Sequence, residues 1–288
     1  MIFEAKPVYQ VPAKHGESSW WDADRGKVFF MDCFGNEMYS YDPETGAKDV
    51  FHLPFHPMAV VPCKSGKFLA TSEDTVYLLD ENLAIEKTLR KFTHNKPTDR
   101  FNDCKCGPDG AFYIGLMGQE DELDEGKLYR LSPEGDLDIV LDGVGISNGI
   151  VWTADQKTVY YTDTVHGEVY SFAFADGKLT DKKTIFRDPA LQPDGMCIDA
   201  EDRIWLALWS SAKVVCIDPE NGQILHEVRA DVPLTSSAVF GGKDLTTLYI
   251  TTSRLLLTEQ QTEEFPLSGS LYAAEVGVKG ALMFKGDF

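Results

Sequence analysis

The sequence has few cysteines and no long apolar run. Six cysteines scattered over 288 residues do not indicate a disulfide framework, because a chain of this length can hold its core without one. We therefore expect reduced thiols. No stretch reaches the ~18 consecutive apolar residues of a membrane-spanning helix, and the first residues lack the apolar segment of a signal peptide. These absences predict a cytoplasmic protein without a membrane partner.

Basic residues are also scarce, and the common soft-metal motifs are missing. Against 46 acidic residues there are only 27 lysines and arginines, which gives a formal charge of −19. Such a chain repels phosphate backbones, so nucleic acid is not an expected partner. There is no C-x-x-C pair and no H-E-x-x-H, and the six histidines are scattered. The usual zinc and thioredoxin-like signatures are therefore absent.

The sequence does contain an internal repeat, although helical periodicity is nearly absent. Six short alternating runs follow turns at intervals of about 40 to 47 residues. They are "GKVFFMD", "GKFLATS", "GAFYIGL", "KTVYYTD", "DRIWLAL" and "TTLYITT". Each is followed by a second run, such as "NEMYSYD" or "GKLYRLS", that is typical of a hairpin partner. Most units add a third strand-like run, such as "LDIVLDG".

Units of four short strands at this period predict an all-β fold, a six-bladed β-propeller. We expect four-stranded antiparallel blades around a central channel, in a single domain spanning residues 1–288. The glycine doublets and Gly-His…Trp-Asp signatures of kelch and WD repeats are missing. The first residues, "IFEAKPVYQ", resemble an extra strand that joins the last blade and closes the ring.

The inner strand of each blade is expected about ten residues before each of the six runs. The first positions of these six segments share one place in the repeat, at one mouth of the channel. They are Glu17, Met58, Asn102, Asn148, Asp194 and Ser237. Carboxylate and carboxamide oxygens on one ring suit a hard cation such as calcium, magnesium or manganese, or zinc through its oxygen chemistry. The repeat alone leaves an alternative open, in which these side chains cap strand ends.

Several segments together resemble a known family in order and spacing. They are "GESSWW", "DRFNDCKCGPDG", "GISNGIVWTADQKTVYYTD", "QPDGMCIDAEDRIW" and "AVFGGKDLTTLYIT". The chain is similar over nearly its whole length to the senescence marker protein/gluconolactonase/luciferin-regenerating enzyme-like family of regucalcin-like sugar lactonases. The resemblance implies a six-bladed propeller with one axial divalent cation. It implies Glu17, Asn148 and Asp194 as metal ligands. It implies Arg100, Asn102 and Glu120 as substrate-binding residues.

The resemblance further implies hydrolysis of a small-molecule sugar lactone to the aldonic acid. The cation, which could be calcium, magnesium, manganese or zinc, would polarise the lactone carbonyl and activate water. Asp194 would be the general base that moves the proton from water to the ring oxygen. Ser19 and Cys104 replace residues that the family commonly has as proline and glycine. Both changes touch the pocket wall, so the sequence does not identify which lactone is the substrate. We expect a monomer or small homo-oligomer.

Other interpretations compete with these assignments. The same metal ring could serve an organophosphate or phosphotriester hydrolase, or a calcium-binding regulatory propeller without catalysis. Arg100 could form a surface ion pair, Asn102 could cap a strand, and Glu120 could lie in a solvated loop. Asp103, one position along the strand, is expected to point away from the channel.

Two local motifs suggest other chemistry. "GISNG", at 145–149, matches the nucleophile-elbow pattern and would make Ser147 a nucleophile, but the following residues predict strand, turn and strand rather than a helix. Cys104 and Cys106 lie two residues apart on one expected strand, with no histidine or second cysteine pair nearby in the sequence. We therefore expect them to be packing residues. Trp20, Trp21, Phe101 and Trp209 flank the site segments and receive no role.

Overall fold

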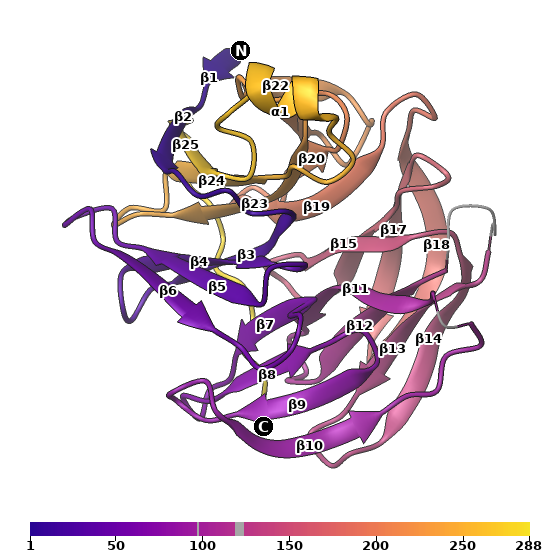
Figure 1. Cartoon of the computed structure of the whole chain (residues 1–288). Helices are drawn as coiled ribbons and strands as arrows, with labels where there is room; N and C mark the ends of the chain where they lie inside the picture. Colours follow the sequence, from indigo (N-terminus) through magenta and orange to yellow (C-terminus); the bar gives the residue numbers. More distant parts are fainter. Residues whose placement is uncertain (97, 119–123) are drawn as a thin grey trace.

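The computed structural model is a ring of six β-sheets, the six-bladed propeller that the repeat predicts. It describes residues 1–96, 98–118 and 124–288. Figure 1 shows the sheets arranged around a common centre, in the order of the chain. Each blade is a four-stranded sheet of antiparallel strands, and one blade carries an additional fifth strand. The predicted fold class, including its four-stranded antiparallel blades, is confirmed.

The strands occupy four positions in each blade, counted outward from the channel. The inner strands are β3 (Gly16–Asp22), β7 (Ala59–Pro62), β11 (Arg100–Cys106), β15 (Ser147–Trp152), β19 (Pro193–Ile198) and β23 (Thr235–Gly241). The second strands are β4 (Lys27–Asp32), β8 (Phe68–Thr71), β12 (Phe112–Met117), β16 (Thr158–Asp163), β20 (Ile204–Leu208) and β24 (Thr247–Thr252). These strands coincide with the segments that the repeat assigns to the first two positions.

The outer half of each blade follows the same order. The third strands are β5 (Glu37–Tyr41), β9 (Thr75–Leu79), β13 (Gly126–Leu131), β17 (Glu168–Ala175), β21 (Lys213–Ile217) and β25 (Leu271–Glu275). The outermost strands are β6 (Lys48–His52), β10 (Ile85–Lys91), β14 (Leu137–Val144), β18 (Lys178–Arg187), β22 (Ile224–Arg229) and, from the start of the chain, β2 (Lys6–Tyr9). The inner strands are almost wholly buried, whereas the outermost strands expose many side chains.

The core lies between neighbouring blades, and aromatic side chains contact one another across these interfaces. The interblade pairs include Trp20 with Phe68 at 5.9 Å, Tyr113 with Trp152 at 4.9 Å, and Trp205 with Phe240 at 5.4 Å between ring centroids. Each inner strand contacts the inner strands of both adjacent blades. The ends of the six inner strands at the channel mouth are therefore held at fixed positions relative to one another.

The two ends of the chain close the ring. β2 pairs antiparallel with β25, so the start of the chain supplies the outer strand of the last blade, as predicted. The first part of the same segment behaves differently, because β1 (Ile2–Glu4) pairs parallel with β22 of the preceding blade. The predicted single strand is thus two short strands, with Ala5 buried between them. Figure 1 shows both strands crossing the seam between these two blades.

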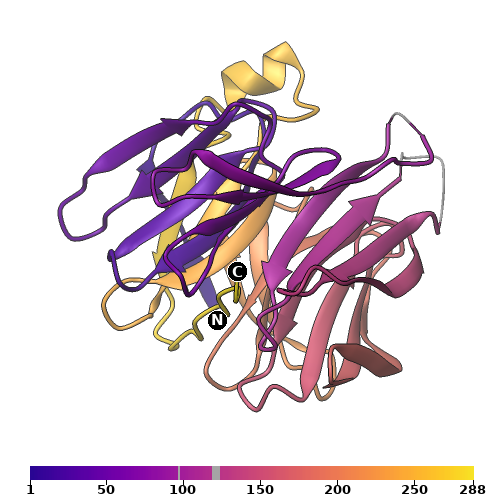
Figure 2. The ribbon, with the colours of Figure 1, turned by 90° about the horizontal axis from the view of Figure 1, so that it is seen from below.

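The end of the chain crosses the far end of the channel. Residues 280–287 form backbone hydrogen bonds with Leu245 and Ile198 at one side and with Pro62 and Gly110 at the other. Figure 2 shows this segment passing through the middle of the ring. The one helix in the described part of the chain, α1 (Glu259–Glu264), has no buried residue. No helix in the described ranges is long and apolar enough to span a membrane.

Candidate active site

Backbone bulges shape the mouth of the channel. In five of the six inner strands, the pairing with the second strand shifts register at the same level. The shifts lie between Glu17 and Trp20, Phe101 and Cys104, Ser147 and Ile150, Pro193 and Met196, and Thr235 and Ala238. A bulge frees residues from the ladder and redirects their side chains. Asn102, Asn148 and Asp194 all lie within such shifts, so these bulges orient the predicted site residues.

Glu17 and Asp194 form a buried pair of acidic side chains. They are 8% and 5% exposed, and they come from blades one and five. Burial and the negative charge of Asp103 raise the pKa of Glu17 to about 8. Burial, with Glu17 and Asp103 nearby, raises the pKa of Asp194 well above its usual range. Neither carboxyl forms an ion pair within the described residues, so the pair is electrostatically unfavourable unless a cation or protons compensate it.

Asn148 connects this pair to blade four. Its side chain hydrogen-bonds to Asp194, and its amide donates to the Thr164 hydroxyl at 3.1 Å. Thr164 in turn donates to the carbonyl of Pro193 at 2.7 Å, next to Asp194. Asp194 thus interacts with both other members of the predicted ligand set. The three side chains that the repeat places on one ring converge in the structure.

The donor set is compatible with a hard divalent cation. Two carboxyl groups and a carboxamide offer oxygen ligands, and calcium, magnesium and manganese favour such ligands. Burial without an ion pair makes the ionised forms of Glu17 and Asp194 unfavourable, and a bound cation would compensate their charge. No group of three His, Cys, Asp or Glu side chains with metal-binding geometry occurs in the described part of the chain. Any site here therefore depends on Asn148 or on water to complete the ligands.

Asp103 does not point away from the channel, so the sequence-based expectation is wrong. Its charge acts on Glu17 and Asp194, which belong to blades one and five, and it is buried. The cause is the bulge between Phe101 and Cys104, which breaks the simple alternation of sides along β11. Asp103 therefore contributes a third negative charge to the same region.

A cavity of about 480 Å³ opens above this cluster. Arg100, Asn102, Asn148 and Asp194 all line it. One Arg100 guanidinium nitrogen donates to the Asn102 side-chain oxygen at 3.0 Å and to the Phe101 carbonyl at 2.9 Å. The Asn102 amide donates to the Ser147 carbonyl at 2.9 Å. Four predicted site residues therefore share one pocket.

Arg100 is held at the pocket without an ion pair among the described residues. Its guanidinium lies 5.5 Å from the centre of the Phe34 ring and contacts the Met58 sulfur at 3.5 Å. Burial lowers its pKa from the usual value, although nearby acidic groups such as Glu17 partly offset this. The surface ion pair considered for Arg100 is not present in the described ranges. Glu120, the other predicted substrate-binding residue, lies outside the described residues.

Two aromatic residues of this pocket, His15 and Trp209, received no role from the sequence, which singled out Trp209 only as flanking the site segments. Their ring centroids lie 5.2 Å apart in an edge-to-face arrangement. A ring nitrogen of His15 lies 3.1 Å from the Ser253 hydroxyl. Burial, together with the charge of Arg100, lowers the pKa of His15 to about 3, so the imidazole is neutral. The sequence did contain one signal for His15. This residue lies two positions before Glu17, near the start of an inner strand, and residues two apart on a strand lie on the same side.

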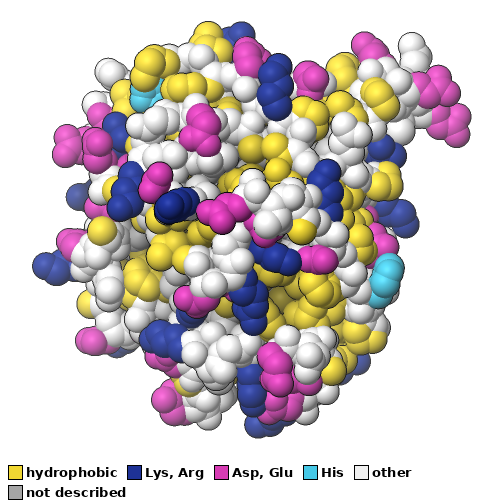
Figure 3. Space-filling model, turned by 90° about the vertical axis from the view of Figure 1, so that its left-hand side faces the viewer, with side chains coloured by type: hydrophobic (Ala, Val, Ile, Leu, Met, Phe, Trp, Pro, Cys, Tyr) yellow, Lys and Arg dark blue, Asp and Glu magenta, His cyan; other side chains and the backbone are white. Residues whose placement is uncertain are grey.

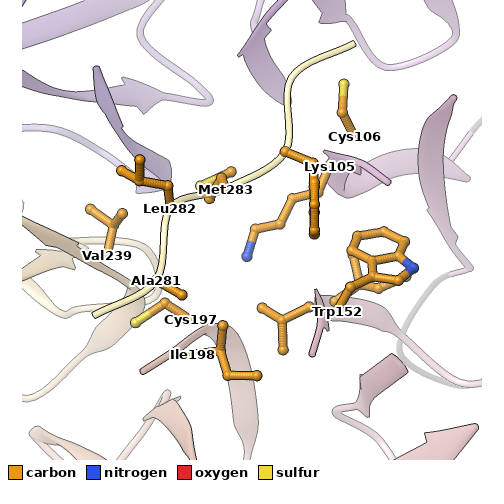
Figure 4. Close-up of a pocket in the computed structure, with 12 residues that line it drawn as sticks. Lys105, Cys106, Trp152, Cys197, Ile198, Val239, Ala281, Leu282 and Met283 are labelled. Atoms are coloured by element: carbon orange, nitrogen blue, oxygen red, sulfur yellow. The ribbon is translucent and has the colours of Figure 1, made fainter. Parts of the chain in front are cut away.

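The other end of the channel is apolar and closed. Figure 4 shows the Lys105 side chain extending into a small cavity, with the C-terminal segment across it. Its ammonium donates to the Met196 carbonyl at 2.5 Å, and its charge lowers the pKa of Glu17 and Asp103 relative to burial alone. Ala281, Leu282 and neighbouring residues of the terminal segment line this cavity. The polar mouth is therefore the open end of the channel.

The two competing local motifs do not form reactive sites. Ser147 is fully buried and accepts a hydrogen bond from the Tyr161 hydroxyl at 2.6 Å. It is followed by β15 and β16 rather than by a helix, so the nucleophile-elbow geometry is absent. All six cysteines are free and buried. Burial raises the pKa of Cys104 to about 12, which agrees with a packing role.

Comparison with known proteins agrees with this architecture. A family model described as "SMP-30/Gluconolactonase/LRE-like region" matches residues 15–254. The crystal structure of regucalcin from Agrobacterium tumefaciens, described as a calcium-binding protein, superposes with a TM-score of 0.92. The two chains are 24% identical, and the match covers 100% of this chain and 99% of that one. This likeness shows the shared six-bladed fold.

Two curated relatives match at the level of sequence. Regucalcin from Xenopus laevis is 33% identical over 278 residues, which cover 93% of each chain. The Bacillus subtilis (strain 168) protein named "Putative sugar lactone lactonase YvrE" is 31% identical over 281 residues, covering 94% of this chain and 95% of that one. With the family model spanning all six inner strands, these matches settle the family. The chain belongs to the SMP-30/gluconolactonase/LRE-like family.

Proposed function

We propose that this protein is a divalent-metal-dependent lactonase that opens a sugar lactone to the aldonic acid. The observation that carries the proposal is the position of Asp194. This carboxyl lines the open cavity, interacts with Glu17 and Asn148, and shares the pocket with Arg100 and Asn102. The name of the Bacillus subtilis relative supports the same reaction class. The proposal includes a single cytoplasmic domain spanning residues 1–288.

In this proposal Glu17, Asn148 and Asp194 hold the cation. When bound, it would supply Lewis-acid polarisation of the lactone carbonyl and a lowered pKa for water. Asp194 accepts the proton of the attacking water and returns it to the ring oxygen as the acyl–oxygen bond breaks. The products are one hydroxyl and one carboxyl group on the opened chain, and the carboxyl group ionises by releasing its proton to the solvent, so no other reactant is needed.

Arg100 and Asn102 would orient the substrate. Arg100 has guanidinium N–H groups beyond those bonded to Phe101 and Asn102, and these can donate to a ring hydroxyl or to the product carboxylate. The hydrogen bond between Asn102 and the Ser147 carbonyl fixes the amide beside that guanidinium. Glu120 stays a predicted hydroxyl acceptor.

A metal-by-substrate matrix tests the proposal. Metal-free protein is reloaded with calcium, magnesium, manganese or zinc, and acid release is measured with glucono-, galactono-, xylono- and arabinolactones. Paraoxon and diisopropyl fluorophosphate are assayed in parallel. Metal-dependent turnover of at least one lactone, orders of magnitude above the organophosphates, is the expected result. Uniformly absent lactone hydrolysis would overturn the proposal.

A second candidate is a calcium-binding propeller without catalysis. The relative from Xenopus laevis and the Agrobacterium structure both bear the name regucalcin, and the latter is described as calcium-binding. The same matrix separates the two functions when calorimetry with calcium chloride accompanies it. Tight calcium binding without hydrolysis of any lactone would favour this second candidate.

A further inference from the structure

The cavity at the channel mouth has two chemically different halves. Its floor carries the polar groups Arg100, Asn102, Asn148 and Asp194. Its remaining lining includes a set of apolar side chains, which we call the apolar rim: Met117, Ile146, Val165, Trp209, Leu255 and Leu256. A pocket for a fully hydroxylated ring would be expected to place donors and acceptors on every side. The rest of the lining also includes three polar residues, His15, Thr164 and Gln192, but its apolar residues outnumber them.

Two rim side chains are exposed to solvent. Leu256 is 74% exposed and Val165 is 38% exposed, although both contribute to the lining of the cavity. They come from different blades, since Val165 follows β16 and Leu256 follows β24. A single exposed leucine is unremarkable. Two apolar side chains from separate blades at the entrance of one pocket form a surface that a ligand can cover.

The backbone holds Leu256 in an unfavourable conformation. Its φ is +66°, a left-handed value that a branched apolar residue rarely adopts. Leu256 lies in a turn that is closed by the Leu257 amide, which donates to the Arg254 carbonyl at 3.1 Å. The Arg254 guanidinium anchors this turn by donating to the carbonyls of Ser268 and Pro266, at 2.7 Å each. The Leu255 amide also donates to the Ser253 hydroxyl at 3.0 Å. Leu83 and Leu245 have similar φ values in other turns, so this conformation fixes the position of Leu256 but does not by itself mark a functional site.

This fixed loop is connected to the polar half of the pocket. The Ser253 hydroxyl that anchors Leu255 also contacts a ring nitrogen of His15 at 3.1 Å. His15 in turn meets Trp209 edge to face, at 5.2 Å between centroids. The apolar rim is therefore continuous with the residues around Arg100. It is part of the same site and not an independent surface.

The cavity has room for a substituent beyond one ring. Its volume of about 480 Å³ falls in the range of ~300–1,000 Å³ that encloses drug-sized ligands. A single six-membered lactone placed against Asp194 would leave the rim in contact with water. An apolar group attached to that ring would cover the rim.

We propose that the apolar rim binds an alkyl or aryl substituent on the lactone ring, so that the preferred substrates are substituted, partly apolar lactones. This inference rests on the proposed lactonase function. Water adds to the carbonyl carbon, the bond to the ring oxygen breaks, and the ring oxygen leaves as a hydroxyl. The substituent takes no part in this chemistry. Its burial against Leu255 and Leu256 strengthens binding by about fourfold for each methylene removed from water.

Hydrolysis of a matched pair of lactones tests the inference. δ-Decalactone carries a pentyl chain on the ring of δ-valerolactone, and D-glucono-1,5-lactone is the hydroxylated reference. We expect kcat/KM for δ-decalactone to exceed that for δ-valerolactone at least tenfold. In Leu256→Gln this ratio should fall about tenfold, mainly through KM for δ-decalactone. Ile139→Gln is the control, because Ile139 is 54% exposed on the outer strand β14, and it should leave the ratio unchanged.

Direct binding separates a failure of this inference from a failure of the lactonase proposal. The corresponding lactams, with and without the pentyl chain, resist hydrolysis and are titrated into the protein by calorimetry. The pentyl lactam should bind at least tenfold more tightly in the wild type, and this advantage should shrink in Leu256→Gln. Equal binding of the two lactams, or a pentyl chain that lowers kcat/KM, would overturn the inference. Tighter binding of the pentyl lactam with no hydrolysis of any lactone would support binding of the substituent at the apolar rim, and it would contradict the lactonase proposal.

Discussion

At the scale of single residues, the site brings together buried acidic groups that repel one another when they are ionised. Glu17, Asp103 and Asp194 place three acidic groups in a buried region, with Lys105 beneath them. Part of this arrangement was predictable, because the repeat placed Glu17, Asn148 and Asp194 among six equivalent positions on one ring. The family resemblance then implied these three as metal ligands. Asp103 was not, since the bulge that turns it inward depends on backbone pairing rather than on residue type. His15 was not singled out and Trp209 was left without a role, because no motif distinguishes a pocket aromatic residue from a core one.

The assigned role of Asp194 predicts the phenotype of its replacement. Asp194→Ala should lower kcat/KM for the best lactone by at least 10³-fold, because it removes both a metal ligand and the general base. The circular dichroism spectrum should stay that of the wild type. Asp218→Asn, in a turn of blade five whose carboxyl accepts the Glu220 amide, is the matched control and should keep normal turnover. Wild-type activity in Asp194→Ala would remove the assignment.

The raised pKa of Glu17 predicts how the stability of the metal-free protein depends on pH. The folded state favours the protonated carboxyl, with a pKa of about 8 against an ordinary value of 4.5. The folded state therefore binds more protons than the unfolded state between these values, and stability falls as pH rises through this window. A difference of one bound proton between the two states changes the free energy of unfolding by about 1.4 kcal/mol per pH unit. Urea unfolding in EDTA from pH 5 to 8 measures this slope.

Glu17→Gln supplies the comparison for that experiment. Because glutamine does not titrate, the variant should lose stability less steeply than the wild type over the same pH range. Adding the cation that supports turnover should flatten the wild-type slope as well, since the metal takes over the role of the proton. Identical slopes in metal-free wild type and variant would show that Glu17 is not the titrating group.

At the scale of elements, the strand pattern was largely predictable and the irregularities were not. Alternating runs such as "GKVFFMD" correspond to β4 and its equivalents, and turn chemistry marked their ends. Asp42, for example, accepts the amides of Glu44 and Thr45, and Gly46 follows with a φ of +72°. The division of the first segment into β1 and β2 had no such signal. Its two halves pair with strands more than 200 residues away, in different blades.

The closure of the ring by β2 predicts a large effect of a substitution there. Tyr9 is buried and lies edge to face with Phe30 and Tyr39 of blade one, at 6.1 and 5.9 Å between centroids. Tyr9→Ala should lower the free energy of unfolding by ~3 kcal/mol or more, as for other buried aromatic residues. Equilibrium urea denaturation provides the measurement. Lys6→Ala, exposed on the same strand, should change it by less than ~0.5 kcal/mol.

At the scale of the whole molecule, the family relationship and the ring architecture account for the site. Figure 3 shows charges of both signs dispersed over one face among apolar side chains. Composition limited the expected classes of partner, whereas the repeat predicted which strand ends meet at one mouth of the channel. The candidate site residues lie together at one mouth of the channel because six inner strands from distant parts of the sequence start there. The C-terminal segment closes the opposite end.

This terminal closure gives a further prediction. A Cβ atom on Gly280 would lie 2.0 Å from the Cβ of Phe240, a buried residue of β23. Gly280→Ala should therefore displace the terminal segment and lower the melting temperature by several degrees. Lys279→Ala, an exposed neighbour, is the control and should leave the melting temperature unchanged. Equal melting temperatures for both variants would show that the segment is not held by this contact.

The seam of the ring also determines the order in which the molecule can be assembled. The first residue bonds to Leu225, and Lys14 and His15 bond to Ser253, so closure joins parts of the chain 224 to 239 positions apart. The terminal segment then connects blades two, three, five and six. During synthesis, the middle blades can form hairpin by hairpin, whereas β1 and β2 stay unpaired until β22 and β25 have been synthesised. Contacts this distant in sequence slow folding, and the pocket with its buried acidic groups is complete only after the last blade has left the ribosome.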